Sequence, residues 1–273
     1  MADVTYKITH LTVQGANKQT MRLFYRDILG LIEQEVAENE FSYAFTADEM
    51  PFLTIVFGGK APAEKRGGLY HFAILLPDTG SLATLIDLLI RLQYPMGAGD
   101  HDVSEAFYLN DPDGNGIELY HDRPKENWRW DNGIVTMGTA NVDVQALLEH
   151  KNDTWTGFPV GSIIGHVHFV GDSLTKGDDF FVKLLNMDTT YVITDNAHFY
   201  SHNHYHHHHA YNTWLGNGVK MRQENEIGLV DWQVLVDETY FNELTQRAGH
   251  KLLDESTLLI DDPFGNTLIV EKF

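Results

Sequence analysis

Glu118 is the acidic residue that first suggests chemistry, because it interrupts a strand of apolar residues. It lies near the end of residues 100–120, DHDVSEAFYLNDPDGNGIELY. The DPDGN segment predicts a tight turn between two strands. Alternation along the second strand places Glu118 and Tyr120 on one face, opposite Ile117 and Leu119. A carboxylate on a half-buried strand requires a partner, because an unpaired buried charge is costly. The chain contains 15 histidines as candidate partners.

Composition narrows the classes of function. The formal charge of −20 argues against nucleic acid, whose phosphates it would repel. The absence of cysteine excludes disulfides, thiolate metal sites and a cysteine nucleophile. No apolar run approaches the roughly 20 residues of a membrane span, and residues 1–11 do not resemble a secretory signal. We therefore expect a cytoplasmic protein that acts on a small molecule.

Four segments of the chain repeat one pattern, a short alternating strand followed by a helix-like stretch. The four strands are expected at residues 8–13, 69–76, 164–170 and 229–236. Segments with strand character and turn punctuation follow the helices, and DPFGN at 262–266 echoes DPDGN at 111–115. The two halves of the chain therefore repeat each other, separated by a connector at residues 126–160.

These repeats resemble the vicinal oxygen chelate superfamily, which includes glyoxalases, epimerases, bleomycin-binding proteins and extradiol ring-cleaving dioxygenases. The segments that carry the resemblance are HFAILLPD, GDHDVSEAFYLNDPDGNGIELY and HHHHAYNTW, and they look most like the two-domain catechol 2,3-dioxygenase group. The resemblance implies an α+β fold in which four βαβββ units are paired into two open, barrel-like domains. We expect residues 1–125 to form the first domain, with units at about 5–60 and 67–123, and residues 161–273 to form the second.

The resemblance also implies a metal site made by the first strand of each unit and the last strand of the pair. Matched residue by residue, the first half supplies His10, His71 and Glu118. Two imidazoles and one carboxylate form a facial triad suited to non-haem Fe(II), with Mn, Zn, Ni and Co as alternatives. The ordinary alternative is that each histidine is a half-buried residue bonded to a neighbour.

Two further histidines match catalytic positions of the extradiol enzymes. His101 precedes the VSEAFYLNDPDG strand, where those enzymes keep a histidine that contacts substrate, and it would handle protons. His207 matches an acid/base histidine just before a small residue, and alternation would put His206 on the opposite face. Tyr120 is a candidate to bind substrate. For His101 and His207, a solvated loop remains the alternative.

The second half departs from the family pattern. His166 is kept, but Asp231 stands where the first half has His71, and Ile269 replaces Glu118. Glu271, two residues further on, could restore an acid through a bulge. His166, Asp231, Glu271 and the run at 206–209 therefore remain candidates for a second metal site.

Three functions remain open. The leading one is a metal-dependent extradiol dioxygenase that acts on a catechol-like aromatic compound with O2. The second is a glyoxalase- or epimerase-type metalloenzyme, although the strand expected at 52–57 lacks the fourth ligand those enzymes usually add. The third is a metal-free protein that binds an aromatic compound or drug. The fold also suggests a homodimer.

Overall fold

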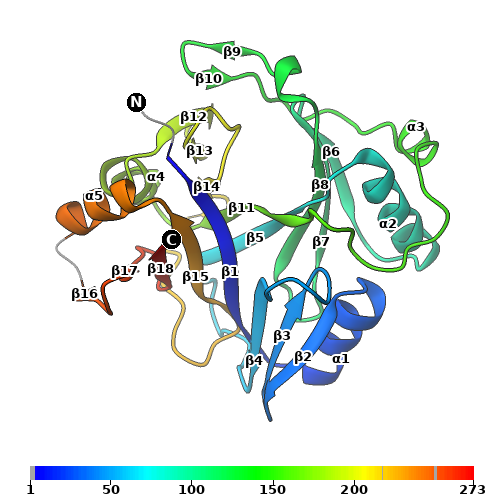
Figure 1. The fold of residues 1–273 in the computed structure, drawn as a ribbon, viewed down its shortest axis with the longest axis horizontal. Coiled ribbons are helices and arrows are strands. Elements are labelled where there is room, and N and C mark those ends of the chain that lie inside the picture. The colour runs from blue at the N-terminus through cyan, green and yellow to red at the C-terminus, as the bar shows by residue number, and fades with distance from the viewer. Residues whose placement is uncertain (1–3, 217, 249–250) are drawn as a thin grey trace.

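The computed structural model describes residues 4–216, 218–248 and 251–273. Its strands form a small two-stranded hairpin and two eight-stranded sheets, and helices cover the outer face of each large sheet (Figure 1). Each sheet contains two copies of the βαβββ unit, as the repeats predict. Within the described ranges, no helix is both long enough and apolar enough to cross a membrane.

The first sheet contains units one and four, in the order β16-β17-β18-β15-β1-β4-β3-β2. Unit one consists of β1 (Tyr6–Gly15), α1 (Lys18–Arg22) with its π-helical continuation η1 (Leu23–Ile28), β2 (Ile32–Ala37), β3 (Glu40–Ala44) and β4 (Leu53–Phe57). Unit four consists of β15 (Gly228–Val236), α5 (Glu238–Ala248), β16 (Lys251–Leu252), β17 (Thr257–Asp261) and β18 (Thr267–Lys272).

The second sheet contains units two and three, in the order β12-β13-β14-β11-β5-β8-β7-β6. Unit two consists of β5 (Gly68–Leu75), α2 (Thr79–Arg91), β6 (Gly97–Asp100), β7 (Ser104–Asn110) and β8 (Gly116–Asp122). Unit three consists of β11 (Ile163–Val170), α4 (Leu174–Asp178) with the π-helical η3 (Asp179–Leu184), β12 (Asp188–Ile193), β13 (Ala197–Ser201) and β14 (His209–Asn212).

The way the units join differs from the predicted grouping. The antiparallel β1–β15 pair joins unit one to unit four, and the β5–β11 pair joins unit two to unit three. Each sheet therefore draws on both of the predicted domains, residues 1–125 and 161–273. All four units offer a first strand of similar alternating pattern, so the sequence does not show which two first strands share an edge.

The predicted DPDGN turn is present and explains how β7 and β8 keep their register. The Asp111 carboxylate accepts backbone hydrogen bonds from Asp113 and Asn115 at 3.0 and 2.9 Å, and Gly114 adopts a φ of +93°. The Tyr25 hydroxyl donates to the same carboxylate at 2.9 Å, which ties the turn to unit one. Asp262 makes the equivalent bonds to Phe264 and Asn266 in unit four.

The connector runs over the second sheet rather than between two separate bodies. It contains the 3-10 turn η2 (Lys125–Asn127), the hairpin β9 (Trp130–Asp131) and β10 (Ile134–Val135), and helix α3 (Val144–Leu148). An apolar cluster holds the hairpin against unit three, with Trp128, Val135 and Met137 packed against Phe199 and Tyr205. The segment after the hairpin thereby reaches the concave face of the second sheet.

Candidate metal centre and its cavity

The candidate metal ligands come from three adjacent strands of the second sheet. His71 lies on β5, Glu118 on β8 and His166 on β11. In the strand register, Ala73 of β5 is opposite both Glu118 and His166, and His71 lies two residues before Ala73. Residues two apart on a strand share a face, so the three polar side chains converge above Ala73, whose methyl group leaves them room.

The three donor atoms lie within ligand distance of a common point. The Nε2 atoms of His71 and His166 lie 3.0 and 3.1 Å from Glu118 Oε2, and 3.4 Å from each other. Ligands bound at about 2.0–2.2 Å and at right angles around one ion are roughly 3 Å apart. Within the described residues, these three side chains are the group of His, Asp or Glu that could hold a metal ion. The donor set therefore fits a divalent metal bound by two imidazoles and a carboxylate.

Burial and neighbouring side chains together favour the metal-binding forms of Glu118 and His166. His71, Glu118 and His166 expose only 6%, 3% and 1% of their surface. Burial raises the pKa of Glu118, but the two adjacent imidazoles outweigh it and hold the pKa well below its ordinary value. Burial lowers the pKa of His166 despite the nearby carboxylate. An ionised carboxylate and neutral imidazoles are the forms that ligate metals.

His10, which the sequence analysis placed with His71 and Glu118, lies in the other sheet. It sits on β1, opposite Gln233 of β15, and its Nδ1 atom lies 2.9 Å from the carbonyl oxygen of Pro51. The structure thus brings together two of the three predicted ligands and adds His166, which the sequence analysis had assigned to a separate second site. The reason is the pairing of β5 with β11.

The second-half candidates other than His166 are also outside the cluster. Asp231 lies on β15, opposite Thr12, where burial raises the pKa of its carboxyl against the opposing effects of Thr12 and His10. Ile269 is opposite Gln233, and Glu271 is opposite Leu235 on the same pair of strands. Asp231 and Glu271 therefore belong to the first sheet, away from His166.

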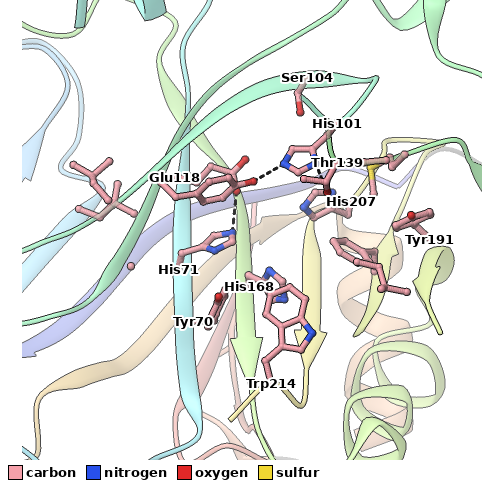
Figure 2. Close-up of a pocket in the computed structure, with 18 of the residues that line it drawn as sticks. Tyr70, His71, His101, Ser104, Glu118, Thr139, His168, Tyr191, His207 and Trp214 are labelled. Carbon is pink, nitrogen blue, oxygen red and sulfur yellow. Dashed lines mark hydrogen bonds and ion pairs between the residues drawn. The ribbon is translucent and has the colours of Figure 1, made fainter. Parts of the chain in front are cut away.

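A cavity of about 440 Å³ opens beside the metal centre (Figure 2). This volume is within the usual range for small-molecule sites. Its walls are mainly aromatic and aliphatic, and they include the connector segment. The lining residues include Tyr70, His71, His101, Tyr108, Glu118, Met137, Gly138, Thr139, His168, Tyr191, Ile193, Phe199, His207 and Trp214.

His101 lies at the cavity wall with a defined hydrogen-bonding state. Its Nδ1 atom lies 2.8 Å from the carbonyl oxygen of Gly138, which can only accept, so Nδ1 carries the proton. Nε2 is then left to accept from the Tyr108 hydroxyl, which lies 2.6 Å away. The hydrogen bond to Gly138 of the connector therefore orients the His101 ring so that its Nε2 atom faces Tyr108.

Tyr108 is a site residue that the sequence analysis missed. Burial, followed by the adjacent Glu118 carboxylate, raises the pKa of its hydroxyl, which therefore stays protonated. The β7–β8 register puts Tyr108 directly opposite Glu118. Counting outward from the DPDGN turn gives this pairing, so the signal was present in the sequence. Tyr120, proposed instead as a substrate contact, is fully buried and bonds to the Tyr205 hydroxyl at 3.0 Å, outside the cavity lining.

His207 reaches the same cavity from the histidine-rich segment. Its ring centroid lies 4.1 Å from that of His166, and the Phe199 ring makes an edge-on contact with it at 5.0 Å. Strand β14 begins only at His209, so the predicted alternation does not extend through residues 206–208, and His206 contacts His207 directly at 2.7 Å. His209 instead bonds to Tyr6 of the first sheet at 2.8 Å.

Comparisons with known proteins agree with this architecture. The Glyoxalase/Bleomycin resistance protein/Dioxygenase superfamily profile matches residues 7–119. The chain is 34% identical to "Catechol-2,3-dioxygenase" of Bacillus subtilis over 271 residues, which span 95% of this chain and 94% of the relative. It is also 32% identical to "Biphenyl-2,3-diol 1,2-dioxygenase 3" of Rhodococcus globerulus, over 44% of this chain and 65% of the relative.

Solved structures show the same fold at low sequence identity. A putative dioxygenase from Bacillus subtilis aligns with a TM-score of 0.62 at 11% identity, covering 97% of this chain and 84% of the other. Glyoxalase I from Zea mays aligns with a TM-score of 0.54 at 14% identity, covering 98% and 93%. With the near full-length similarity to the first relative, these findings show that the chain belongs to the glyoxalase/bleomycin resistance protein/dioxygenase superfamily.

Proposed function

We propose that this protein is a metal-dependent extradiol dioxygenase, which cleaves the ring of a catechol-like compound beside its two hydroxyl groups and incorporates both atoms of O2. The observation that carries the proposal is the convergence of His71, Glu118 and His166 at the edge of an aromatic-lined cavity. The names of the two relatives identified by sequence, a catechol dioxygenase and a biphenyldiol dioxygenase, support the same reaction class.

His71, Glu118 and His166 would hold the metal, for which Fe(II) is the first choice and Mn, Zn, Ni and Co are alternatives. Three protein ligands leave further coordination positions open. When bound, such a metal lowers the pKa of a coordinated hydroxyl group and brings the two substrates together.

The residues around the centre would bind and orient the aromatic ring. Tyr70, Phe199 and Trp214 supply flat apolar surface in the cavity wall. The Tyr108 hydroxyl donates its proton to His101 Nε2 at 2.6 Å, so its oxygen is free to accept a hydrogen bond from a substrate hydroxyl. That pair would fix one substrate oxygen and exclude water from the adjacent wall. His207, whose ring stands against His166, would accept a proton from the second substrate hydroxyl.

The test begins with protein freed of metal and reloaded anaerobically with one metal at a time. A panel of catechols is then supplied with O2, and oxygen uptake is measured together with product mass. We expect one O2 consumed per catechol and a product whose mass is that of substrate plus O2. Fe(II) should give the highest rate. Metal binding at the triad with no catechol consumption under any of the five metals would refute the proposal, and would favour a glyoxalase- or epimerase-type reaction.

A further inference from the structure

Asp122 and His206 lie behind His207, outside the lining of the cavity. We infer that this pair is a positioning device: it fixes the proton of His207 on Nδ1 and leaves Nε2 as a bare acceptor toward the cavity. The inference about proton placement stands by itself. Its catalytic consequence rests on the proposed function.

A continuous chain of short hydrogen bonds connects the three residues. The His206 Nε2 atom lies 2.9 Å from Asp122 Oδ1, and His206 Nδ1 lies 2.7 Å from His207 Nδ1. The two imidazoles are buried, with 0% and 8% of their surfaces exposed. Bulk water therefore has little access to compete for these contacts.

The direction of each bond follows from the chemistry of the end group. An ionised carboxylate only accepts hydrogen bonds, so the proton between Asp122 and His206 belongs to His206 Nε2. A neutral imidazole has one protonated nitrogen, which leaves His206 Nδ1 as an acceptor. The facing Nδ1 of His207 must then carry the proton. Nε2 of His207 is left with a free lone pair, and within the described chain it has no hydrogen-bond partner.

The carboxylate that starts this chain is itself held in place. Asp122 is the last residue of β8, four residues after Glu118 on the same strand. Its second oxygen accepts a hydrogen bond from the Tyr205 hydroxyl at 2.8 Å, and Tyr205 in turn contacts Tyr120 at 3.0 Å. Asp122 and Tyr205 also line a second cavity between the two sheets. Asp122 therefore stands between the buried imidazoles and a more open space.

The consequence is a histidine prepared to act as a general base. When His207 Nε2 takes a proton from a substrate hydroxyl, a new N–H bond forms and the substrate O–H bond breaks. The Nδ1 proton can then move toward His206, whose positive charge Asp122 stabilises. Without the carboxylate, no other contact in the described chain selects the Nδ1 form of His207.

The first experiment needs no catalysis. Metal-free protein labelled with ¹⁵N at histidine is examined by NMR, with His206→Asn and His207→Asn used to assign the two rings. We expect His207 protonated at Nδ1 and His206 protonated at Nε2. In Asp122→Asn the amide can donate as well as accept, so we expect the His207 proton to redistribute toward Nε2. Wild-type His207 protonated at Nε2 would overturn the inference.

The second experiment measures the catalytic consequence. With the loaded enzyme, Asp122→Asn should lower kcat about 100-fold while leaving KM and metal content within twofold, because general acid–base catalysis contributes factors of this order. Asp122→Glu retains a carboxylate and should recover part of kcat. The matched control is His208→Gln, which changes a buried neighbour bonded to Ser201 rather than to the site.

The two failures are distinguishable. If His207 holds its proton on Nδ1 but no catechol is cleaved even by the wild type, the proposed function fails and the positioning role stands. If the wild type cleaves catechol and Asp122→Asn matches its kcat, the positioning role fails and the proposed function stands.

Discussion

The cavity beside the metal centre predicts discrimination between neutral and carboxylated catechols. In the described part of the chain, none of the residues lining it is Lys or Arg. Burial holds the pKa of His168 and of His207 well below the ordinary value, so these two imidazoles add no positive charge. Among the described lining residues the acidic side chain is Glu118, which in the loaded enzyme would be paired with the bound metal. A catechol whose two hydroxyl groups face the metal would therefore place an additional ring carboxylate where it loses water without gaining a Lys or Arg partner.

The size of the effect follows from the cost of that desolvation. An unpaired ion buried in a protein costs several kcal/mol even after relaxation. Water can partly enter this open cavity, which we take to reduce the desolvation cost of the carboxylate to about 3 kcal/mol. Because each 1.4 kcal/mol corresponds to a factor of ten, kcat/KM should then fall about 100-fold. A neutral substituent of the same size should not produce this loss.

The assay compares a carboxylated catechol with its methyl ester and with unsubstituted catechol under identical O2 and metal loading. We expect kcat/KM for the ester near that for catechol, and kcat/KM for the acid about 100-fold lower. Ile193→Lys, which places a cation in the cavity wall, should narrow the gap between acid and ester. Equal kcat/KM for acid and ester in the wild type would refute the reasoning.

Three further predictions concern the centre and its surroundings. His71→Ala and His166→Ala should each abolish stoichiometric metal binding, measured by metal analysis after dialysis, whereas His10→Ala should not; loss in His10→Ala alone would contradict the site. Tyr108→Phe, which removes the partner of His101 Nε2, should lower kcat about tenfold with metal content unchanged, and an unaltered kcat would remove Tyr108 from the mechanism. Burial lowers the pKa of His202 to about 4 from an ordinary 6.5, so its stabilising contribution is complete above pH 6.5 and is lost as the pH falls toward 4. The difference between the two pKa values corresponds to about 3 kcal/mol of unfolding free energy. Urea unfolding between pH 7 and 4 measures this loss, and His202→Asn should make the unfolding free energy less dependent on pH.

Features that depend on local sequence were predictable. The turn at Asp111 follows from side-chain bonds to its own backbone, and its echo at Asp262 has the same cause. The face shared by His71 and Ala73 follows from strand alternation, as does the orientation of Glu118. The hydrogen bonds of His101 were not predictable, because its partner Gly138 comes from a connector without periodic pattern. The direct contact between His206 and His207 was not predicted for a related reason, since the backbone before β14 is irregular and the expected alternation does not hold there.

Which residues form the metal centre depends on which two units pair through their first strands. The strand registers show why the sequence alone does not determine this pairing. In unit two, the residue two positions after His71 lies opposite Glu118. The corresponding position is Thr54 in unit one, Ala210 in unit three and Ile269 in unit four. Only unit two thus supplies a carboxylate there, so a triad requires it to pair with a unit whose first strand offers a histidine. Units one and three both qualify, through His10 and His166, and local pattern does not separate them. The β5–β11 pairing selects His166. It leaves His10 in the first sheet with Asp231 on the neighbouring strand, where the described residues offer no third ligand.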